Sequence, residues 1–536
     1  MVRNIIAWVD DRTGAISGVH RFLDEEIPAS AGWHQVFGSV ALFAFLIQVA
    51  TGLLLALNYG GTPSEAHSSL RYIMTELTGG AMIRGLHHWG SSAMIIVVAL
   101  HMAQVFLWGA YKKPREATWI LGVVLLLLTL GFGLTGYLLP WDNRAYWGTV
   151  VTTQIAGLPP VAGPYVKRLL GAEGDGIGVV TFSRFYAAHI MLLPLIALLT
   201  IAAHVFLVRR HGITPTPEDA GLPKKRFYPQ QVFKDTVAMF VFTVILALLA
   251  NFAKVGLGAV ADPTDTAYIP RPEWYFLFLF QFLKFFDGPL EVVGAVVLPT
   301  IAVLALAAAP FFDRGHVRRV QKRTLAMALV AFAAIGWAGL TQRAIATTPP
   351  STEDSEAGLK PLPLWKEIPA DSLASIGTFR KANCTQCHAP GKSSAGPDLA
   401  KRVSTKSERW LTAHFTHPVE ESPANDFNGA QMKGLLALAT KRDEKVVEAW
   451  INAPQEAVEG AMIFQSRQCI FCHTLNGVGG KVGPTINGLS SRRDRTWIME
   501  HFSDPEKFTP GSDMPPYKFA DRDLAMITDY LLAIPK

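Results

Sequence analysis

The chain has 536 residues, of which 50% are hydrophobic and only 17% are charged, and its mean hydropathy is +0.25. It is too apolar for an ordinary soluble protein and too long for a single domain. The formal net charge of +6 does not indicate a nucleic-acid partner, because the basic residues gather in short loops between apolar runs. We therefore expect a membrane protein with a soluble tail.

The first 31 residues precede any run that is long enough to cross a bilayer. The acidic residues Asp10, Asp11, Asp24, Glu25 and Glu26 interrupt the apolar ones, so the pattern of a cleavable signal peptide is absent. Residues 1–31 are predicted to form an amphipathic segment that lies on the inner membrane surface.

Seven later runs are apolar and long enough to be membrane-spanning helices. They cover residues 33–57, 80–110, 118–139, 180–208, 236–254, 290–311 and 323–342. The connections after the second, fourth and sixth runs are rich in Lys and Arg, which by the positive-inside rule indicates a cytoplasmic N-terminus. An odd number of spans then delivers residue 345 onward to the outer side.

Two of these runs each carry a pair of histidines, His87 with His101 and His189 with His204. Fourteen residues make almost four helical turns, so His87 and His101 share one face. The fifteen-residue interval of the other pair rotates its second member a little but keeps both facing the same way. Two packed helices would present two facing pairs, each a bis-imidazole site for a non-covalent b haem. Hydrogen bonding between helices is the alternative, although four such costly side chains argue against it.

Four glycines repeat the fourteen-residue interval in the first and third runs, namely Gly38 with Gly52 and Gly122 with Gly136. Glycine lets a flat macrocycle approach a helix backbone closely. Glycines are also common at simple helix-packing contacts.

All four cysteines lie in two Cys-x-x-Cys-His motifs, made of Cys384, Cys387 and His388, and of Cys469, Cys472 and His473. At this spacing two thiols can add to the vinyl groups of a haem while the histidine binds the iron. A redox dithiol would leave the histidines unexplained, and a zinc site needs a second half. We expect two covalent c haems, attached outside the cytoplasm.

The C-terminal third is an internal duplication. The predicted boundaries are a linker at 346–375, a first domain at 376–453 and a second domain at 454–536. In both copies a Gly-Pro pair follows the motif, as Gly396-Pro397 and as Gly483-Pro484.

Several motifs together resemble cytochrome b of the quinol-oxidising cytochrome bc complexes, over about residues 20 to 345. They are Arg84-Gly85-Leu86-His87-His88-Trp89-Gly90, Gly136-Tyr137-Leu138-Leu139-Pro140-Trp141-Asp142, Tyr146-Trp147-Gly148-Thr149-Val150-Val151 and Pro272-Glu273-Trp274-Tyr275. The fifteen-residue interval and the absence of an eighth span are similar to the photosynthetic type. In that type a four-helix cytochrome, here 32–212, and a three-helix subunit, here 213–345, are separate chains.

The resemblance implies an outer quinol pocket. Glu273 would accept a quinol proton there, and Tyr275 and Tyr137 would line the same pocket. Glu273 has an alternative role as a partner of Arg271 or as a helix-end carboxylate. Of the two quinol electrons, one would leave for a Rieske iron-sulfur protein. The other would pass through the His87/His189 haem to the His101/His204 haem and reduce quinone near the inner surface, with net proton translocation.

Further site residues follow from the same resemblance. Arg84 and Arg184 would pair with haem propionates. Arg209, Arg210 and His211 lie at the right depth for an inner quinone site, but topology alone explains basic residues there. The photosynthetic type attaches an extra haem through a cysteine where this chain has Val36, so no covalent haem is expected at that site.

Each copy of the tail resembles a small class I cytochrome c, in which a methionine supplies the sixth ligand. That ligand would be Met514 in the second copy and Met432 in the first, where His414 or His417 could replace it. His501 matches His414, which favours a shared structural role for these two histidines.

The expected fold is all-α, with a seven-span bundle that contains a four-helix dihaem core, followed by two small cytochrome c domains. The expected function is that of a bacterial quinol:cytochrome c oxidoreductase subunit in the cytoplasmic membrane. Its cofactors would be two b haems and two c haems. Its partners would be a Rieske protein, membrane quinone, an acceptor cytochrome c or terminal oxidase, and a second copy of the chain. The alternatives are a Rieske-independent conduit from quinol to a periplasmic reductase, or a membrane anchor that docks soluble cytochromes.

Overall fold

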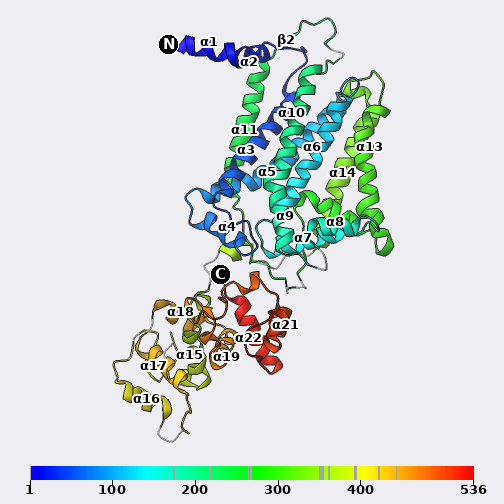
Figure 1. The fold of residues 1–536 in the computed structure, drawn as a ribbon. Coiled ribbons are helices and arrows are strands. Elements are labelled where there is room, and N and C mark those ends of the chain that lie inside the picture. The colour runs from blue at the N-terminus through cyan, green and yellow to red at the C-terminus, as the bar shows by residue number, and fades with distance from the viewer. Residues whose placement is uncertain are drawn as a thin grey trace. The chain divides into compact units, whose positions relative to one another are not determined.

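The chain is divided into two compact units, Met1–Leu359 and Lys360–Lys536, in a computed structural model (Figure 1). The described residues are 2–172, 176–216, 219–263, 265, 268–348, 355–359, 363–391, 395–401, 403–419, 423–441 and 443–535. Both units are mainly helical, as predicted. Their only paired strands among the described residues are two short antiparallel pairs.

Among the described residues, seven membrane-spanning candidates make up most of the first unit, which confirms the predicted number of spans. Each is a mainly apolar helical segment of at least 22 residues, which is long enough to cross a hydrocarbon core. The spans are η1–α3 (Trp33–Gln35 and Val36–Ala56), α5 (Gly80–Leu107), α6 (Glu116–Tyr137), α9–η2–α10 (Val179–Ala187, Ala188–Leu192 and Leu193–His211), α11 (Gln230–Phe252), η5–η6–α13 (Gly288–Leu290, Val293–Val297 and Leu298–Phe312) and α14 (Thr324–Thr347).

Short helices gather at one end of this bundle, here called the pocket end, opposite to α1 and α2 (Figure 1). They are α4 (Ala66–Thr75), α7 (Asn143–Ala156) and α8 (Gly163–Leu170). The same unit also contains η4–α12 (Trp274–Phe276 and Leu277–Leu283) and η8 (Ala357–Leu359). Asp142 fixes the start of α7, because its carboxylate accepts a hydrogen bond from the amide of Ala145 at 2.8 Å.

The opposite end, here called the N-terminal end, carries α1 (Val2–Thr13) and α2 (Ala15–Leu23). Strand β1 (Glu26–Ile27) pairs with β2 (Lys225–Arg226). Three consecutive acidic residues pair with bases at the end of the fourth span and in the connection after it. The ion pairs are Asp24–Arg226, Glu25–Arg209 and Glu26–Lys224. Three of the five acidic residues that interrupt the apolar pattern of the first segment therefore form these ion pairs. Asp10 instead accepts hydrogen bonds from the amides of Ile16 and Ser17.

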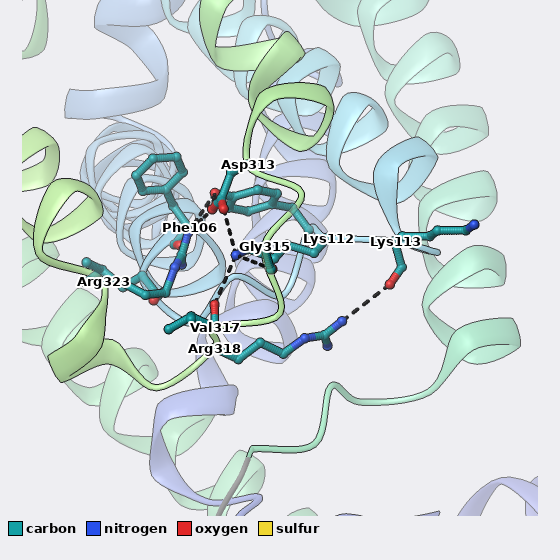
Figure 2. A network of polar contacts seen from close by, with 10 residues as sticks. Phe106, Lys112, Lys113, Asp313, Gly315, Val317, Arg318 and Arg323 are labelled. Atoms are coloured by element: carbon teal, nitrogen blue, oxygen red, sulfur yellow. Dashed lines mark hydrogen bonds and ion pairs between the residues drawn. The ribbon is translucent and has the colours of Figure 1, made fainter.

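A buried polar network joins the α5–α6 connection to the α13–α14 connection, which includes η7 (Val320–Lys322) (Figure 2). Lys112 donates to Asp313 at 2.7 Å and to two backbone carbonyls of the turn that follows Asp313. Arg323 donates to the other oxygen of Asp313 at 2.5 Å and to the hydroxyl of Tyr111 at 2.7 Å. The Lys112 and Arg323 side chains are only 6% and 5% exposed. This network ties the last two spans to the preceding bundle.

The second unit contains both cytochrome-like copies around one continuous hydrophobic core. Its helices are η9 (Leu364–Lys366), α15 (Ala370–Lys381), η10 (Cys384–Gln386), α16 (Glu408–Thr416), α17 (Gly429–Thr440), α18 (Glu444–Asn452), α19 (Gln455–Ser466), η11 (Cys469–Phe471), η12 (Leu489–Ser491), α20 (Arg495–Ser503), α21 (Pro505–Phe508) and α22 (Asp521–Ala533). Strands β3 (Thr474–Leu475) and β4 (Val478–Gly479) form a hairpin.

The predicted linker at 346–375 ends too late. Helix α15 begins at Ala370, and its side chains Leu373 and Ala374 are fully buried in the core of the second unit. Both α15 and α19 begin fourteen residues before the first cysteine of their motif. The first cytochrome-like copy therefore begins before residue 376. Its first helix, α15, is the counterpart of α19 in the second copy and contributes side chains to the core.

Candidate haem sites and outer pocket

The four predicted histidines of the spans come together in two facing pairs. His87 of α5 faces His189, and their ring centroids lie 6.4 Å apart with the ring planes inclined at 75°. His101 lies farther along α5, and His204 lies on α10 close enough to influence it electrostatically. The first pair is nearer the pocket end. A single metal ion fits between two imidazoles at this separation, since each metal–nitrogen distance is about 2 Å.

The fourth span contains a five-residue π-helical turn, Ala188–Leu192, at His189 itself. Pro194, which follows this turn, has no amide hydrogen and would clash with a carbonyl of a regular α-helix. A π-turn absorbs one additional residue. The fifteen-residue interval from His189 to His204 therefore behaves like the fourteen-residue interval of α5. The rotation expected from the longer interval is removed by this turn.

Threonine hydroxyls orient the first histidine pair. Thr51 Oγ1 lies 3.0 Å from Nδ1 of His87, and Thr135 Oγ1 lies 3.0 Å from Nδ1 of His189. A second partner on one ring nitrogen fixes the ring and leaves the other nitrogen for a metal. In the second pair, Nδ1 of His101 is buried without a hydrogen-bond partner among the described residues.

Each of the four repeating glycines lies against one histidine ring. A Cβ atom added at Gly136 would stand 2.7 Å from Cε1 of His189, and one at Gly52 would stand 3.2 Å from Cε1 of His87. The corresponding distances are 3.2 Å for Gly38 to His101 and 3.5 Å for Gly122 to His204. Glycine thus lets the histidine-bearing helices approach the first and third spans closely. The two ring pairs and their glycines fit a pair of bis-imidazole haem sites.

The predicted outer-pocket residues meet at the pocket end, beside the first histidine pair. Tyr275 is buried, and its hydroxyl would lie 2.9 Å from a Cβ atom added at Gly133. The Tyr137 hydroxyl donates to the carbonyl of Arg271 at 3.2 Å. The Trp274 indole donates to Ser92 Oγ of α5 at 3.2 Å, which ties the Pro-Glu-Trp-Tyr segment to the histidine-bearing helix.

Glu273 forms an ion pair, but its partner is Arg144 of α7 and not Arg271. Arg144 Nη2 lies 3.0 Å from Glu273 Oε1, and the guanidinium carbon lies 5.7 Å from the centre of the Tyr137 ring. Burial alone would lower the pKa of Arg144, but Tyr137 and Glu273 outweigh it and raise that pKa above its usual value. Sequence reasoning missed Arg144. Its only signal is a basic residue in a short segment between two recognised motifs.

The two arginines predicted to bind propionates have protein partners. Arg84 is buried, and its guanidinium contacts the sulfur of Met74. Arg184 donates to the backbone carbonyls of Arg168 and Leu169, the latter at 2.8 Å. Their role toward a haem therefore stays a prediction.

The two Cys-x-x-Cys-His motifs have the same local structure. Each begins with a single 3-10 turn, η10 or η11. His388 Nδ1 lies 3.0 Å from the carbonyl of Pro397, and His473 Nδ1 lies 2.8 Å from the carbonyl of Pro484. This contact leaves the Nε2 atom of each ring for a metal.

The glycine before each of these prolines lies against the ring. An added Cβ at Gly396 would overlap the His388 ring, and one at Gly483 would stand 2.5 Å from Cε1 of His473. Among the described residues no cluster of three or more His, Cys, Asp or Glu side chains could hold a metal ion. Within the part of the chain that the structure describes, neither motif is joined by the second half that a zinc site requires. The geometry fits covalent haem attachment.

The predicted sixth ligands occupy different local structures. Met514 lies in the non-helical segment that precedes α22, whereas Met432 lies in the first turn of α17. Both side chains pack against the core. The ring centroids of His414 and His388 lie 6.0 Å apart. The His414 ring stacks on Trp410, and the His501 ring stacks on Trp497 in the same way. This equivalence supports a shared packing role for the two histidines.

Comparison with known families identifies three segments. Residues 92–260 match the N-terminal cytochrome b family, which includes b6. Residues 260–353 match the C-terminal cytochrome b family, and residues 457–535 match the cytochrome c family.

Individual relatives give the same result. The chain is 36% identical over 319 residues to a cytochrome bc complex cytochrome b subunit of Chlorobaculum thiosulfatiphilum, which covers 58% of this chain and 74% of the relative. It is 38% identical to a menaquinol:cytochrome c reductase cytochrome b subunit of Geobacillus thermodenitrificans, over 40% of this chain and 99% of the relative.

A solved structure entitled hyperthermophilic respiratory Complex III has a TM-score of 0.57 and 28% identity, and covers 65% of this chain and 92% of that chain. The matched segments include the third to seventh spans, the Pro-Glu-Trp-Tyr segment and the second Cys-x-x-Cys-His motif. The chain therefore belongs to the cytochrome b family of cytochrome bc complexes, and it joins that cytochrome b to a cytochrome c region.

Proposed function

We propose that this chain is the cytochrome b and dihaem cytochrome c subunit of a bacterial quinol:cytochrome c oxidoreductase. The observation that carries the proposal is the position of Glu273, Tyr137 and Tyr275 beside the first histidine pair. A carboxylate there can take a proton from a quinol whose electrons are accepted nearby. The relatives named as cytochrome c reductase subunits support the same reaction class.

Four haems complete this proposal. The pairs His87/His189 and His101/His204 would hold two b haems, and the two Cys-x-x-Cys-His motifs would hold two c haems with Met432 and Met514 as sixth ligands. When bound, these haems supply one-electron carriers across the bilayer and on its outer side.

The residues of the pocket handle the proton. Glu273 accepts it from the quinol hydroxyl, while Tyr137 and Tyr275 shape the cavity wall and exclude water. One electron of the quinol goes to a Rieske iron-sulfur partner. The other would cross the membrane through haems held by the two histidine pairs and would reduce quinone near the inner surface, so that protons would be released outside and taken up inside.

The remaining parts of the proposal concern location and partners. The N-terminus lies in the cytoplasm and the cytochrome c region on the outer face of a bacterial cytoplasmic membrane, because the basic connections lie on the inner side. The working form is a homodimer that contains a Rieske protein. Its acceptor is a cytochrome c or a terminal oxidase.

The test compares the purified chain with the complete complex. A pyridine haemochrome spectrum should give two extractable b haems and two covalent c haems for each chain. Added quinol should drive sustained reduction of the c haems only when the Rieske partner is present. Sustained turnover by the isolated chain would contradict bifurcation and favour the Rieske-independent conduit instead.

A further inference from the structure

The Arg144–Glu273 ion pair joins a mostly buried carboxylate to a partly exposed guanidinium. Glu273 is only 18% exposed, whereas the Arg144 side chain is 47% exposed. The carboxylate is thus on the buried side of the pair and the guanidinium on the open side. The two residues are 129 positions apart in the chain, so the contact depends on the docking of α7 against the Pro-Glu-Trp-Tyr segment.

The guanidinium is itself held in place by its neighbours. It lies 5.7 Å from the Tyr137 ring, within the range of a cation–π contact. Asp142, two residues earlier, also favours its charged form. Gly148 of α7 allows this arrangement, because a Cβ atom there would stand 2.5 Å from Tyr137 Cε1. Arg144 therefore presents a fixed positive charge to the Glu273 carboxylate.

We infer that Arg144 is a positioning residue for the proton acceptor of the proposed function, on which this inference rests. It holds the ionised Glu273 carboxylate at the pocket wall until quinol binds. The pair is partly exposed, and such ion pairs are weak enough to be broken and remade in each turnover.

Proton transfer then ends the contact. One of the two quinol O–H bonds breaks as an O–H bond forms on Glu273, and the other quinol proton would leave with the electron that goes to the iron-sulfur partner. The second electron would be accepted at the His87/His189 haem site. The neutral carboxylic acid no longer attracts Arg144 as an anion does. Its side chain is free to turn toward the solvent side of the pair and lose the proton there, after which Arg144 captures the carboxylate again.

The experiment is a double-mutant cycle in the complete complex, assayed with a short-chain quinol. E273Q should lower kcat/KM by about 100-fold, the usual worth of a positioned acid–base group. R144Q should lower it by about 10-fold. The double variant should be no worse than E273Q, because Arg144 acts through Glu273. R144K, which keeps the charge, should recover most of the loss. K224Q, which breaks the exposed Lys224–Glu26 pair at the N-terminal end, is the matched control and should match wild type.

Two further measurements separate positioning from folding. The haem content should stay at two b and two c in every variant. The infrared difference spectrum on quinol oxidation should show the loss of a carboxylate band. This band should be absent in E273Q and shifted in R144Q, because Arg144 contacts the ionised form of Glu273. A wild-type rate and band in R144Q, or losses that multiply in the double variant, would overturn the inference while leaving Glu273 in place. Full activity of E273Q would instead remove the proton acceptor and the inference with it.

Discussion

At the scale of single residues, the histidine sites depend on four glycines, because glycine has no Cβ atom that would occupy the space of the histidine ring. The four glycines differ in how closely a histidine ring approaches them, from 2.7 Å at Gly136 to 3.5 Å at Gly122 for an added Cβ atom. The former distance forces the ring to move, whereas the latter is ordinary van der Waals contact. This gradation gives a test of haem binding in which the two b sites serve as controls for each other.

G136A should therefore displace the His189 ring and lower the b-haem content toward one for each chain, while the c haems stay at two. G122A should keep both b haems. The reason is steric: only the added methyl group at residue 136 occupies space that the imidazole needs. The measurement is the ratio of b to c haem in a haemochrome spectrum. Equal retention of b haem in both variants would contradict the proposed role of His189.

The sixth ligands can be separated in the same way. M514L should remove a thioether from the second c haem and M432L one from the first, and each change should lower the midpoint potential of one c haem. Redox titration followed by absorbance measures both. If M432L leaves the titration unchanged, the first c haem has another sixth ligand, and the His414 ring at 6.0 Å from His388 is the next residue to replace.

At the scale of elements, sequence periodicity predicted the spans and the facing histidines but not how the longer interval is accommodated. The π-turn at His189 depends on Pro194 and on packing against α6, which hydrophobic periodicity does not encode. The predicted linker takes in the first half of α15, although the buried residues of that helix pack into the core as those of α19 do. Arg144 was missed because its partner is 129 residues away.

The Lys112–Asp313–Arg323 network connects the last two spans to the α5–α6 connection. Replacing Asp313 by Asn leaves two nearly buried cations without their carboxylate. The free energy of unfolding should fall by about 2 kcal/mol, below the full cost of breaking a buried pair because Asp313 itself is 37% exposed. Thermal unfolding in detergent measures this loss. D24N, at the exposed Asp24–Arg226 pair, is the control and should cost less than about 0.5 kcal/mol.

The same network predicts a dependence on pH. Burial alone would raise the pKa of Asp313, but hydrogen bonds from Lys112, Tyr111 and Arg323 outweigh it and hold that pKa below its usual value of 3.8. A lowered native pKa stabilises the fold above the unfolded-state value, and this contribution is lost as the pH falls through the native value. The difference in stability between wild type and D313N should therefore be constant at neutral pH and shrink below about pH 4. A difference that grows on acidification would contradict this assignment.

At the scale of the whole molecule, the sequence divides the tail into two tandem domains, whereas the structure gives it one core. Helices α15 and α19, the first helix of each copy, pack directly on each other. Gly377 lies at this contact, where an added Cβ would overlap the sulfur of Met462 and stand 3.2 Å from the carbonyl of Val458. The duplication has therefore produced one folded unit, which keeps the two haem-binding motifs in fixed relation to each other.

Cooperativity tests this arrangement. In the intact chain, the absorbance of both c haems should change in a single thermal transition, because neither copy can open without exposing the shared core. G377L should overpack the α15–α19 contact, destabilise both copies by about 1–3 kcal/mol and move both signals together. G429A is the control, since nothing lies within 4 Å of its added methyl group. Two separate transitions, or a G377L effect confined to the first c haem, would mean that the copies unfold independently. Their relative positions would then depend on the connecting residues and not on the core that they share.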